Sequence, residues 1–240
     1  MADPRFYVPD CNAAVGECVT LPDAAAHHAM RVLRMREGDP IRIFTGRGIE
    51  AHGPIHFYKD GASVEISSVC ETAPGKLRIT LLQALVSNEK MDWIVEKACE
   101  TGVSRIMIYS AARGEVKVNK EKAEKKLERF RKTVVSACMQ CGQNWMPEIV
   151  YADRFEEALS AAEGRRFVTA PSLEASPAGA LEGNSVSFLI GPEGGLTPQE
   201  IDTAVKSGFE PRLLGPRVLR TETAGIAAAV WAQTLWGDYV

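Results

Sequence analysis

The sequence predicts two domains, a small β-barrel followed by an α/β domain with a mostly parallel sheet. Residues 1–72 contain short alternating apolar runs between glycine and proline turns, which is typical of small barrels. Residues 73–240 alternate apolar strands with helical patterns, which is typical of a parallel sheet covered on both faces. The segment 72–76, which contains Pro74 and Gly75, separates the two patterns and marks the expected boundary.

The first domain is expected to be rich in short strands. Clear alternation occurs at residues 41–44 and 62–66, beside glycine turns at 46–48 and 59–61. One short helix is expected to interrupt the strands, at residues 24–34.

The second domain is expected to alternate strands and helices along its whole length. Strands are expected at residues 77–85, 103–109, 148–150, 166–170, 185–190 and 212–214. Helices are expected at residues 90–101, 120–141, 155–162, from 198 onward, and 224–236. The first of these helices places Met91, Ile94, Val95 and Ala98 on one apolar stripe, and Gly102 follows it at a C-cap position.

Composition places the chain among ordinary globular proteins. Of its 240 residues, 45% are hydrophobic and 25% are charged, with a formal net charge of -3. This charge argues against a protein that coats nucleic acid along its whole surface, although it permits a local basic patch. No apolar run is long enough to span a membrane, and the first residues lack the basic start of a signal peptide, so we expect a cytoplasmic protein.

The six cysteines show no regular spacing that would suggest a disulfide framework. Cys138 and Cys141 form a C-x-x-C pair, but neither a second pair nor nearby histidines complete a zinc site. We therefore expect two thiols on one helix face and no metal.

A glycine-rich turn, residues 191–195, follows the expected strand at 185–190. Thr197 is a suitable N-cap for the next helix, Pro198 suits the first helical position, and Glu200 would complete a capping box. The glycine spacing matches neither the dinucleotide fingerprint nor the P-loop, and a carboxylate at Glu193 would repel a phosphate. Two interpretations remain open, a cradle for a neutral or cationic cofactor and an ordinary tight turn.

A second polar turn lies between the expected strand at 212–214 and the last helix. Arg217, Arg220 and Glu222 stand in or beside it, at what should be the carboxyl edge of the sheet, where open α/β sheets bind ligands. A surface ion pair between Arg220 and Glu222 would explain the same residues.

Positive charge is concentrated between residues 113 and 132, a segment that contains nine Lys or Arg residues and only four Glu residues. Such a local surplus suits phosphate contacts, whereas a solvated helix with Glu–Lys pairs four residues apart is the alternative. A smaller cluster in the first domain, His28, Arg31 and Arg34, can share one helix face and contact RNA.

Two segments, LIGPEGG at 189–195 and LGPRVLRTETA at 214–224, closely resemble the signature of the RsmE family. These are 16S ribosomal RNA uridine methyltransferases of the SPOUT superfamily. Supporting matches lie at residues 28, 32–34, 38–39, 90–93, 97, 102–103, 140–142 and 147–148. The sequence departs from the family pattern at Met139, Gln143 and residues 87–89, which affects the expected RNA contacts more than the reaction.

The resemblance implies a PUA-like barrel, a SPOUT domain with a C-terminal trefoil knot, and a homodimer that binds S-adenosylmethionine in the knot. The implied cofactor-binding residues are Ala170, Pro171, Ile190, Gly191, Pro192, Glu193, Gly194, Gly195, Leu214, Gly215, Val218, Leu219, Arg220 and Thr223. The residues expected to contact RNA are His28, Arg31, Arg34, Arg113, Lys117 and Arg129.

The implied reaction is methylation of uracil N3 at a specific uridine of 16S ribosomal RNA, within the small ribosomal subunit. This nitrogen carries a proton at neutral pH, so the site must remove it and stabilise the resulting charge. We expect Arg220 to stabilise the charge, and Glu222 or Glu193 to orient the base or accept the proton. The alternatives are a SPOUT enzyme that modifies a ribose hydroxyl or another base, and a non-catalytic RNA-binding assembly factor. A phosphate-binding nucleotide enzyme is disfavoured by the absence of a P-loop lysine.

Overall fold

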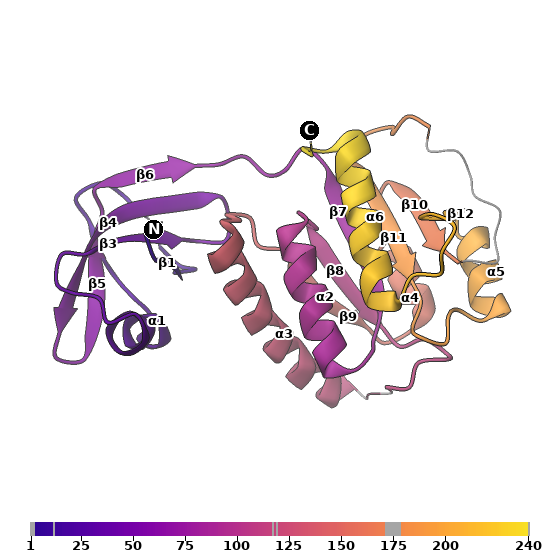
Figure 1. The fold of residues 1–240 in the computed structure, drawn as a ribbon, viewed down its shortest axis with the longest axis horizontal. Helices are drawn as coiled ribbons and strands as arrows, with labels where there is room; N and C mark the ends of the chain where they lie inside the picture. Colours follow the sequence, from indigo (N-terminus) through magenta and orange to yellow (C-terminus); the bar gives the residue numbers. More distant parts are fainter. Residues whose placement is uncertain (1–2, 12, 117, 119, 171–178, 240) are drawn as a thin grey trace. The chain divides into compact units, whose positions relative to one another are not determined.

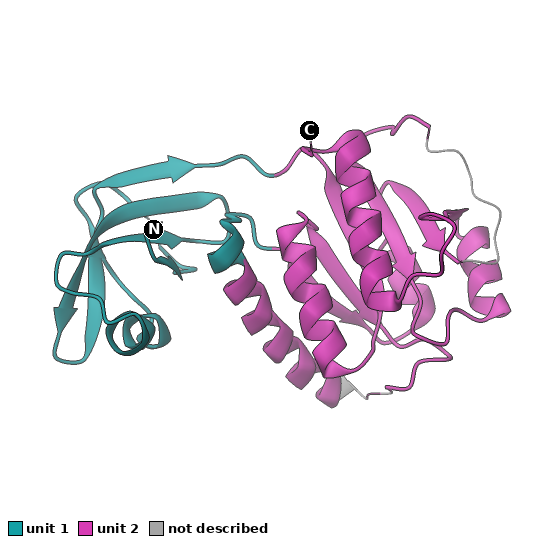
Figure 2. Cartoon of the chain, in the orientation of Figure 1, with its two compact units in different colours: residues 1–74, 138–146 teal, residues 75–137, 147–240 magenta. Residues whose placement is uncertain are grey.

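The chain forms two compact units in the computed structural model, which describes residues 3–11, 13–116, 118, 120–170 and 179–239 (Figure 1). The first unit comprises residues 1–74 and 138–146, and the second comprises residues 75–137 and 147–240 (Figure 2). The segment 138–146 was expected within the second domain. It groups with the first unit because backbone hydrogen bonds join it to the turn at 46–48, from Gly48 N to Asn144 O and from Met146 N to Gly46 O, both 3.0 Å.

The first unit contains a six-stranded sheet whose longest strand, β4, pairs with three others. Its strands are β1 (Arg5–Tyr7), β2 (Cys18–Thr20), β3 (Pro40–Phe44), β4 (Ile49–Tyr58), β5 (Gly61–Glu65) and β6 (Ser68–Glu71). The order is β1-β3-β4-β5-β2, with β6 beside the first half of β4. The strands predicted at 41–44 and 62–66 are confirmed as β3 and β5, within one residue at each end. β6 escaped prediction because all four of its residues are exposed and so show no alternation.

The helix predicted at 24–34 is present only in part. It divides into α1 (Asp23–His27) and a π-helical turn, η1 (His28–Val32), in which Leu33 N donates to His28 O at 3.0 Å. Arg34 follows with a φ of 53°, a left-handed conformation that is uncommon for a residue other than glycine. The wider turn and the positive φ end the helix before residue 34, which the apolar spacing alone could not indicate. π-Turns of this kind are rare and are found frequently at functional sites.

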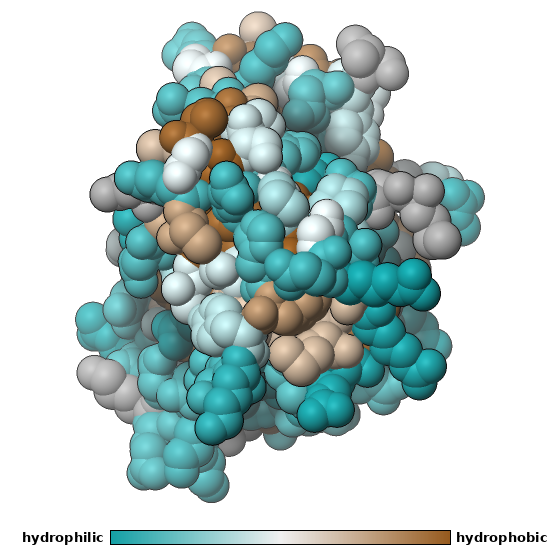
Figure 3. All heavy atoms as spheres, turned by 90° about the vertical axis from the view of Figure 1, so that its left-hand side faces the viewer, coloured by the Kyte–Doolittle hydropathy of each residue, from teal (hydrophilic) through white to brown (hydrophobic). Residues whose placement is uncertain are grey.

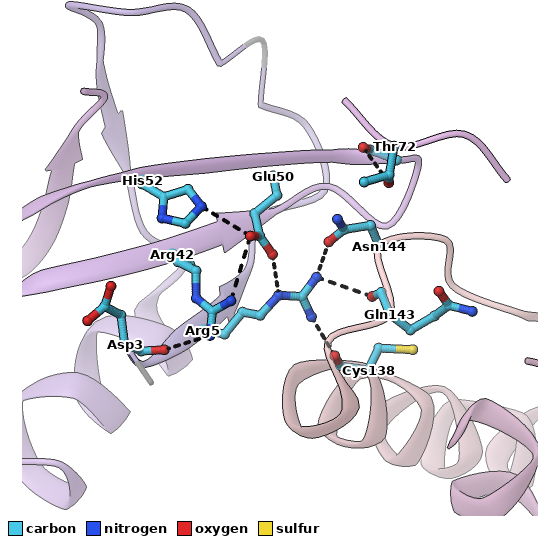
Figure 4. A network of polar contacts seen from close by, with 10 residues as sticks. Asp3, Arg5, Arg42, Glu50, His52, Thr72, Cys138, Gln143 and Asn144 are labelled. Atoms are coloured by element: carbon cyan, nitrogen blue, oxygen red, sulfur yellow. Dashed lines mark hydrogen bonds and ion pairs between the residues drawn. The ribbon is translucent and has the colours of Figure 1, made fainter. Parts of the chain in front are cut away.

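A buried arginine, Arg5, joins the sheet of the first unit to the segment 138–146 (Figure 4). Its Nε donates to Glu50 at 2.8 Å, while its terminal nitrogens donate to Asn144 Oδ1 and to the backbone oxygens of Cys138 and Gln143. Its guanidinium carbon also lies 3.8 Å from the centre of the Phe44 ring. The Cys138 carbonyl lies in the last turn of a helix and accepts both from Arg5 and from the backbone amide of Gly142, the latter at 3.2 Å.

The second unit is built on a six-stranded parallel sheet of order β12-β10-β11-β7-β8-β9. Its strands are β7 (Arg78–Ala84), β8 (Arg105–Tyr109), β9 (Glu148–Ala152), β10 (Arg165–Thr169), β11 (Ser185–Ile190) and β12 (Glu210–Pro211). Its helices are α2 (Asn88–Glu100), α3 (Lys120–Cys141, whose last turn belongs to the first unit), α4 (Phe155–Ser160), α5 (Pro198–Lys206) and α6 (Thr221–Trp236). The mixed α/β class and the parallel sheet are confirmed.

Helices cover both faces of this sheet. α6 packs on β7 and β11 with α2 beside it, whereas α4 contacts β8 and β9 and α5 contacts β10 (Figure 1). Between the sheet and the helices α4 and α5, the core includes Leu82, Tyr109, Leu159, Leu189 and Ala204. On the other face, α6 approaches closely because small residues line its inner side, with Ala228, Ala229 and Ala232 completely buried.

One predicted strand and one predicted helix boundary in the second unit are wrong. The strand expected at 212–214 is absent, because pairing with β10 stops at Pro211 and Leu213 is exposed in the following loop. The last helix begins at Thr221 rather than Ala224, with Arg220 as its N-cap residue.

Cys138 and Cys141 lie in the last turn of α3, the first buried and the second exposed, and neither forms a disulfide bond. A hydrogen bond with Cys138 and partial burial raise the pKa of the Cys141 thiol, which keeps it protonated. Within the described residues, no group of three or more His, Cys, Asp or Glu side chains is arranged to hold a metal ion. None of the described helices has the length and apolar character required to span a membrane.

Substitution of Arg5 should destabilise the first unit more than substitution of its neighbour. In Arg5→Met, Glu50 and three oxygens lose a buried donor, so we expect a loss of about 3 kcal/mol in the free energy of unfolding. Arg42→Met removes a half-exposed cation 3.7 Å from Glu50 and should cost less than about 1 kcal/mol. Urea denaturation monitored by circular dichroism measures both. Equal losses in the two variants would contradict the central role of Arg5.

Candidate active site at the carboxyl edge of the parallel sheet

A cavity of about 530 Å³ lies in the second unit at the carboxyl ends of β10 and β11. The chain adds β8 and β9 on one side of β7, and then crosses to add β11 and β10 on the other side. The carboxyl ends of β7 and β11 therefore form the point at which the strand order reverses, where open α/β sheets bind their ligands. A second cavity of about 250 Å³ shares Thr169, Ala170, Val218, Leu219 and Ala224 with the first.

The glycine-rich turn forms one wall of the larger cavity. Tyr109 Oη donates to Ile190 O at 2.9 Å, which fixes the last residue of β11. Gly195 has a φ of 68°, a conformation that side chains disfavour, and its amide donates to Pro192 O at 2.9 Å to close the turn. The turn is thus held in one shape with its backbone exposed toward the cavity.

The predicted capping box at the start of α5 is confirmed. Thr197 Oγ1 accepts from Glu200 N at 3.1 Å, and Glu200 Oε2 accepts from Thr197 N at 2.7 Å. The other oxygen of Glu200 accepts from Ala112 N at 2.8 Å, so this buried carboxylate also ties the loop after β8 to the glycine-rich turn.

The loop 212–220 and the start of α6 form the opposite wall. Thr221 is buried between the two walls, where its hydroxyl accepts from Gln83 Nε2 at 2.9 Å and donates to Gly191 O at 2.6 Å. This hydroxyl connects the first turn of α6 to the end of β11 and to β7.

Most of the predicted cofactor-binding residues lie in one of the two cavities. Those that line the larger cavity are Ala170, Ile190, Gly191, Pro192, Glu193, Gly195, Val218, Leu219 and Arg220. Leu214 and Gly215 line the smaller cavity, together with Val218 and Leu219. Gly194 and Thr223 line neither: a Cβ on Gly194 would lie 3.2 Å from Arg113 Cβ, and Thr223 is exposed on α6. Pro171 lies outside the described residues.

The three predicted catalytic residues, Arg220, Glu222 and Glu193, all line the larger cavity. Glu222 is half-buried in the first turn of α6, and its Oε2 has no hydrogen-bond partner within the part of the chain that the structure describes. Glu193 differs because its Oε1 lies 2.6 Å from Lys90 Nζ.

The ion pair between Lys90 and Glu193 shifts both groups toward their charged forms. Burial by itself would raise the pKa of Glu193, but the hydrogen bond from Lys90, its own backbone amide and the charge of Lys90 hold it below the ordinary value of 4.5. The hydrogen bond to Glu193 raises the pKa of Lys90 above 10.5, against partial desolvation. The pair is therefore charged over the whole range in which the protein is expected to work.

The sequence did not indicate several residues that line the larger cavity: Lys90, Thr169, Leu196, Ile201, Thr221 and Ala224. Lys90 belonged to a segment that matched the RsmE pattern, but nothing in its spacing placed it near residues one hundred positions away. Thr221 lies within the second motif, but its link between the two walls depends on its burial, which the sequence does not show.

The residues predicted to contact RNA are distributed over both units. His28, Arg31 and Arg34 lie in or directly after the π-helical turn of the first unit, and both arginines are exposed. Figure 3, which views the molecule from the left-hand side of Figure 1, shows a face that is mostly hydrophilic, with hydrophobic residues in small groups.

In the second unit, the two predicted RNA residues that the structure describes, Arg113 and Arg129, already have protein partners. Arg113 lines the larger cavity and donates to Gly194 O at 3.2 Å, while Arg129 on α3 forms an ion pair with Asp92. Glu121 and Lys125 pair at 3.2 Å, as the solvated-helix interpretation of the basic tract requires. Lys117 lies outside the described residues.

Comparison with known proteins assigns the chain to a class. Residues 73–233 match the family model of an RNA methyltransferase domain, and residues 21–55 match that of an RNA methyltransferase PUA domain. The fold and the cavity at its switch point thus define an RNA methyltransferase with an N-terminal PUA-like unit.

Similar proteins of known name identify the family within this class of RNA methyltransferases. The ribosomal RNA small subunit methyltransferase E of Bacillus subtilis is 31% identical over 239 residues, covering 93% of each chain. The structure of the Neisseria gonorrhoeae enzyme of the same name, solved with S-adenosyl methionine, is 35% identical, covers 100% of both chains and has a TM-score of 0.89. A Legionella pneumophila protein solved with the cofactor SAM is 33% identical, with the same coverage and a TM-score of 0.93. The chain belongs to the RsmE family, as its two motifs predicted.

The pKa of Glu193 tests the geometry of the cavity directly. In Lys90→Met the carboxylate loses its donor and counter-charge, while burial still favours the neutral acid, so the pKa of Glu193 should rise. The stabilisation from the wild-type pair is present above 4.5 and is lost as the pH falls through the lowered pKa of Glu193. Carbon-13 NMR titration of the carboxyl group measures both values. An unchanged pKa in Lys90→Met would contradict the ion pair, and Lys97→Met on the same helix is the control.

Proposed function

We propose that this protein transfers a methyl group from S-adenosylmethionine to N3 of a specific uridine in 16S ribosomal RNA. The observation that carries the proposal is the larger cavity, where both motif loops meet around Arg220 and Glu222. The curated relatives are named as methyltransferases of the small ribosomal subunit RNA, and two similar structures hold the methyl donor.

The residues of the cavity fit this cofactor. The glycine-rich turn exposes backbone to a ligand, and a carboxylate oxygen of Glu222 is buried without a hydrogen-bond partner among the described residues. Carboxylates suit a cofactor that carries positive charge, whereas they would repel a phosphate. S-adenosylmethionine supplies a methyl group that the sulfonium has already activated. The remaining predicted cofactor contacts, including Pro171, Gly194 and Thr223, belong to this proposal.

The side chains of the cavity have the types that uracil requires. Loss of the N3 proton places negative charge on the two carbonyl oxygens of the base, and the guanidinium of Arg220 can donate to one of them. A carboxylate, Glu222 or Glu193, accepts or orients the proton. The protein thereby orients the base, excludes water and moves one proton.

The substrate is large, and we infer that both units contact it. His28, Arg31 and Arg34 in the first unit, and Arg113, Lys117 and Arg129 in the second, would contact phosphates of RNA within the assembled small subunit. We also propose a homodimer through α6, whose Val230 and Leu235 are exposed apolar residues, and a location in the cytoplasm, where ribosomal subunits assemble. The trefoil knot and the boundary near residue 72 are part of the same proposal.

A methyl-transfer assay with nucleoside analysis tests the function. The purified protein is incubated with methyl-labelled S-adenosylmethionine and small ribosomal subunits that lack the modification, and the digested RNA is examined by mass spectrometry. We expect labelled 3-methyluridine in 16S RNA. A ribose-methylated or differently methylated nucleoside would identify another SPOUT reaction, and binding of RNA without transfer would indicate an assembly factor.

Arg220→Met should slow methyl transfer on these subunits by about 100-fold, because the uracil anion loses its cationic donor. Affinity for S-adenosylmethionine, measured by calorimetry, should fall by much less than the rate, since Arg220 is only one of many predicted cofactor contacts but supplies the cationic donor to the uracil anion. Arg78→Met, at the amino end of β7 and outside both cavities, is the matched control. Full transfer by Arg220→Met would remove Arg220 from the mechanism.

A further inference from the structure

Among the described residues, five charged side chains line the larger cavity, and one of them, Arg113, donates to the Gly194 carbonyl. The other four are two positive and two negative groups, Lys90, Arg220, Glu193 and Glu222. They come from three segments, the first turn of α2, the glycine-rich turn, and the start of α6 with its N-cap. Lys90 is coupled electrostatically to the other three, because the charges of Glu193, Glu222 and Arg220 each shift its pKa. Their pairing therefore decides which groups are available to a bound base.

The observed pairing leaves one carboxylate available. Lys90 Nζ lies 2.6 Å from Glu193 Oε1, whereas neither an ion pair nor a hydrogen bond to Glu222 is present among the described residues. Arg220 is exposed at the mouth of the cavity and likewise has no carboxylate partner there within the described part of the chain.

The backbone around this arrangement is fixed from several sides. Met91 and Ile94 bury one face of α2, and α2 packs against α6, which carries Glu222. On the other side of the turn, Arg113 donates to Gly194 O at 3.2 Å. The positions of Lys90 and Glu193 are therefore set by packing rather than by their mutual attraction alone.

We propose that Lys90 is a positioning residue for methyl transfer, because by binding Glu193 it prevents this carboxylate from capturing Arg220. Arg220 then remains available to the uracil carbonyl, and Glu222 is the carboxylate that takes the proton. In the reaction, the N3 proton moves to a Glu222 oxygen and the N3 electron pair forms the new bond to the methyl carbon. The electron pair of the broken carbon–sulfur bond remains on sulfur. This inference rests on the proposed function.

The alternative role for Lys90 is a direct contact with an RNA phosphate, since its side chain is 30% exposed. The two roles differ in what happens when Glu193 is also neutralised. If Lys90 acts by occupying Glu193, the loss of Lys90 no longer slows the reaction once Glu193 has also been made neutral. If Lys90 instead contacts RNA, neutralising Glu193 does not restore the rate that is lost with Lys90.

The experiment compares Lys90→Met, Glu193→Gln and the double variant in single-turnover methyl transfer to small subunits, at saturating S-adenosylmethionine. We expect Lys90→Met to be slowed at least about tenfold, because the freed Glu193 pairs with Arg220. The double variant should recover to within about threefold of Glu193→Gln alone, which is the signature of a coupled pair. Lys90→Arg should retain most of the rate because it preserves the ion pair.

Lys97→Met is the matched control, since Lys97 lies on the same helix, pairs with Glu96 and Glu100, and lines neither cavity. Its rate should remain within about twofold of wild type. Cofactor affinity and melting temperature, measured for every variant, separate a folding defect from lost positioning. If Lys90→Met does not fold, Lys90→Gln and the double variant carry the same comparison.

A double variant as slow as Lys90→Met, or a Lys90→Met rate equal to wild type, would overturn the inference. A wild-type protein that transfers no methyl group to uridine N3 would instead refute the proposed function. The two failures are thus distinguishable within one set of assays.

Discussion

Two hydrogen bonds in series, from Gln83 through the buried Thr221 side chain to the Gly191 carbonyl, determine the shape of the cavity. They join three segments that are far apart in the sequence: β7, the first turn of α6 and the end of β11. The glycine-rich turn begins at Gly191, and the loop of the opposite wall ends just before Thr221. Because a buried polar group without a partner costs about 1–3 kcal/mol, this chain of bonds strongly favours one arrangement of both walls.

Close packing of α6 makes these hydrogen bonds possible. A Cβ at Gly225 would lie 3.1 Å from a methyl carbon of Leu81, so any larger residue there would crowd Leu81 and force it to shift. Ala228 and Ala229 continue the small-residue face and are completely buried. The alanine-rich composition of the last helix is therefore a requirement of the site as well as of the core, because it brings the Thr221 hydroxyl within reach of Gln83.

The sequence predicted the RsmE family and the α/β class because two long motifs and the alternation of strands and helices are local signals, and both are confirmed. Local patterns could not predict the Lys90–Glu193 pair, which joins residues 103 positions apart, or the contacts of Arg5 with residues near Asn144. The apolar run at 212–214 indicated a strand, but Leu213 and Leu214 line a cavity instead. Apolar side chains at a ligand site and in a strand give the same sequence signal.

Calorimetric titration of Thr221→Val with S-adenosylmethionine tests most directly whether this chain of hydrogen bonds forms the cofactor site. The substitution preserves side-chain shape but leaves the Gln83 amide and the Gly191 carbonyl without their shared partner. We predict an affinity about tenfold weaker than wild type, since one lost buried partner corresponds to about 1.4 kcal/mol. Thr203→Val, which removes an exposed hydroxyl on α5, should bind like wild type. Unchanged affinity in Thr221→Val would contradict the account.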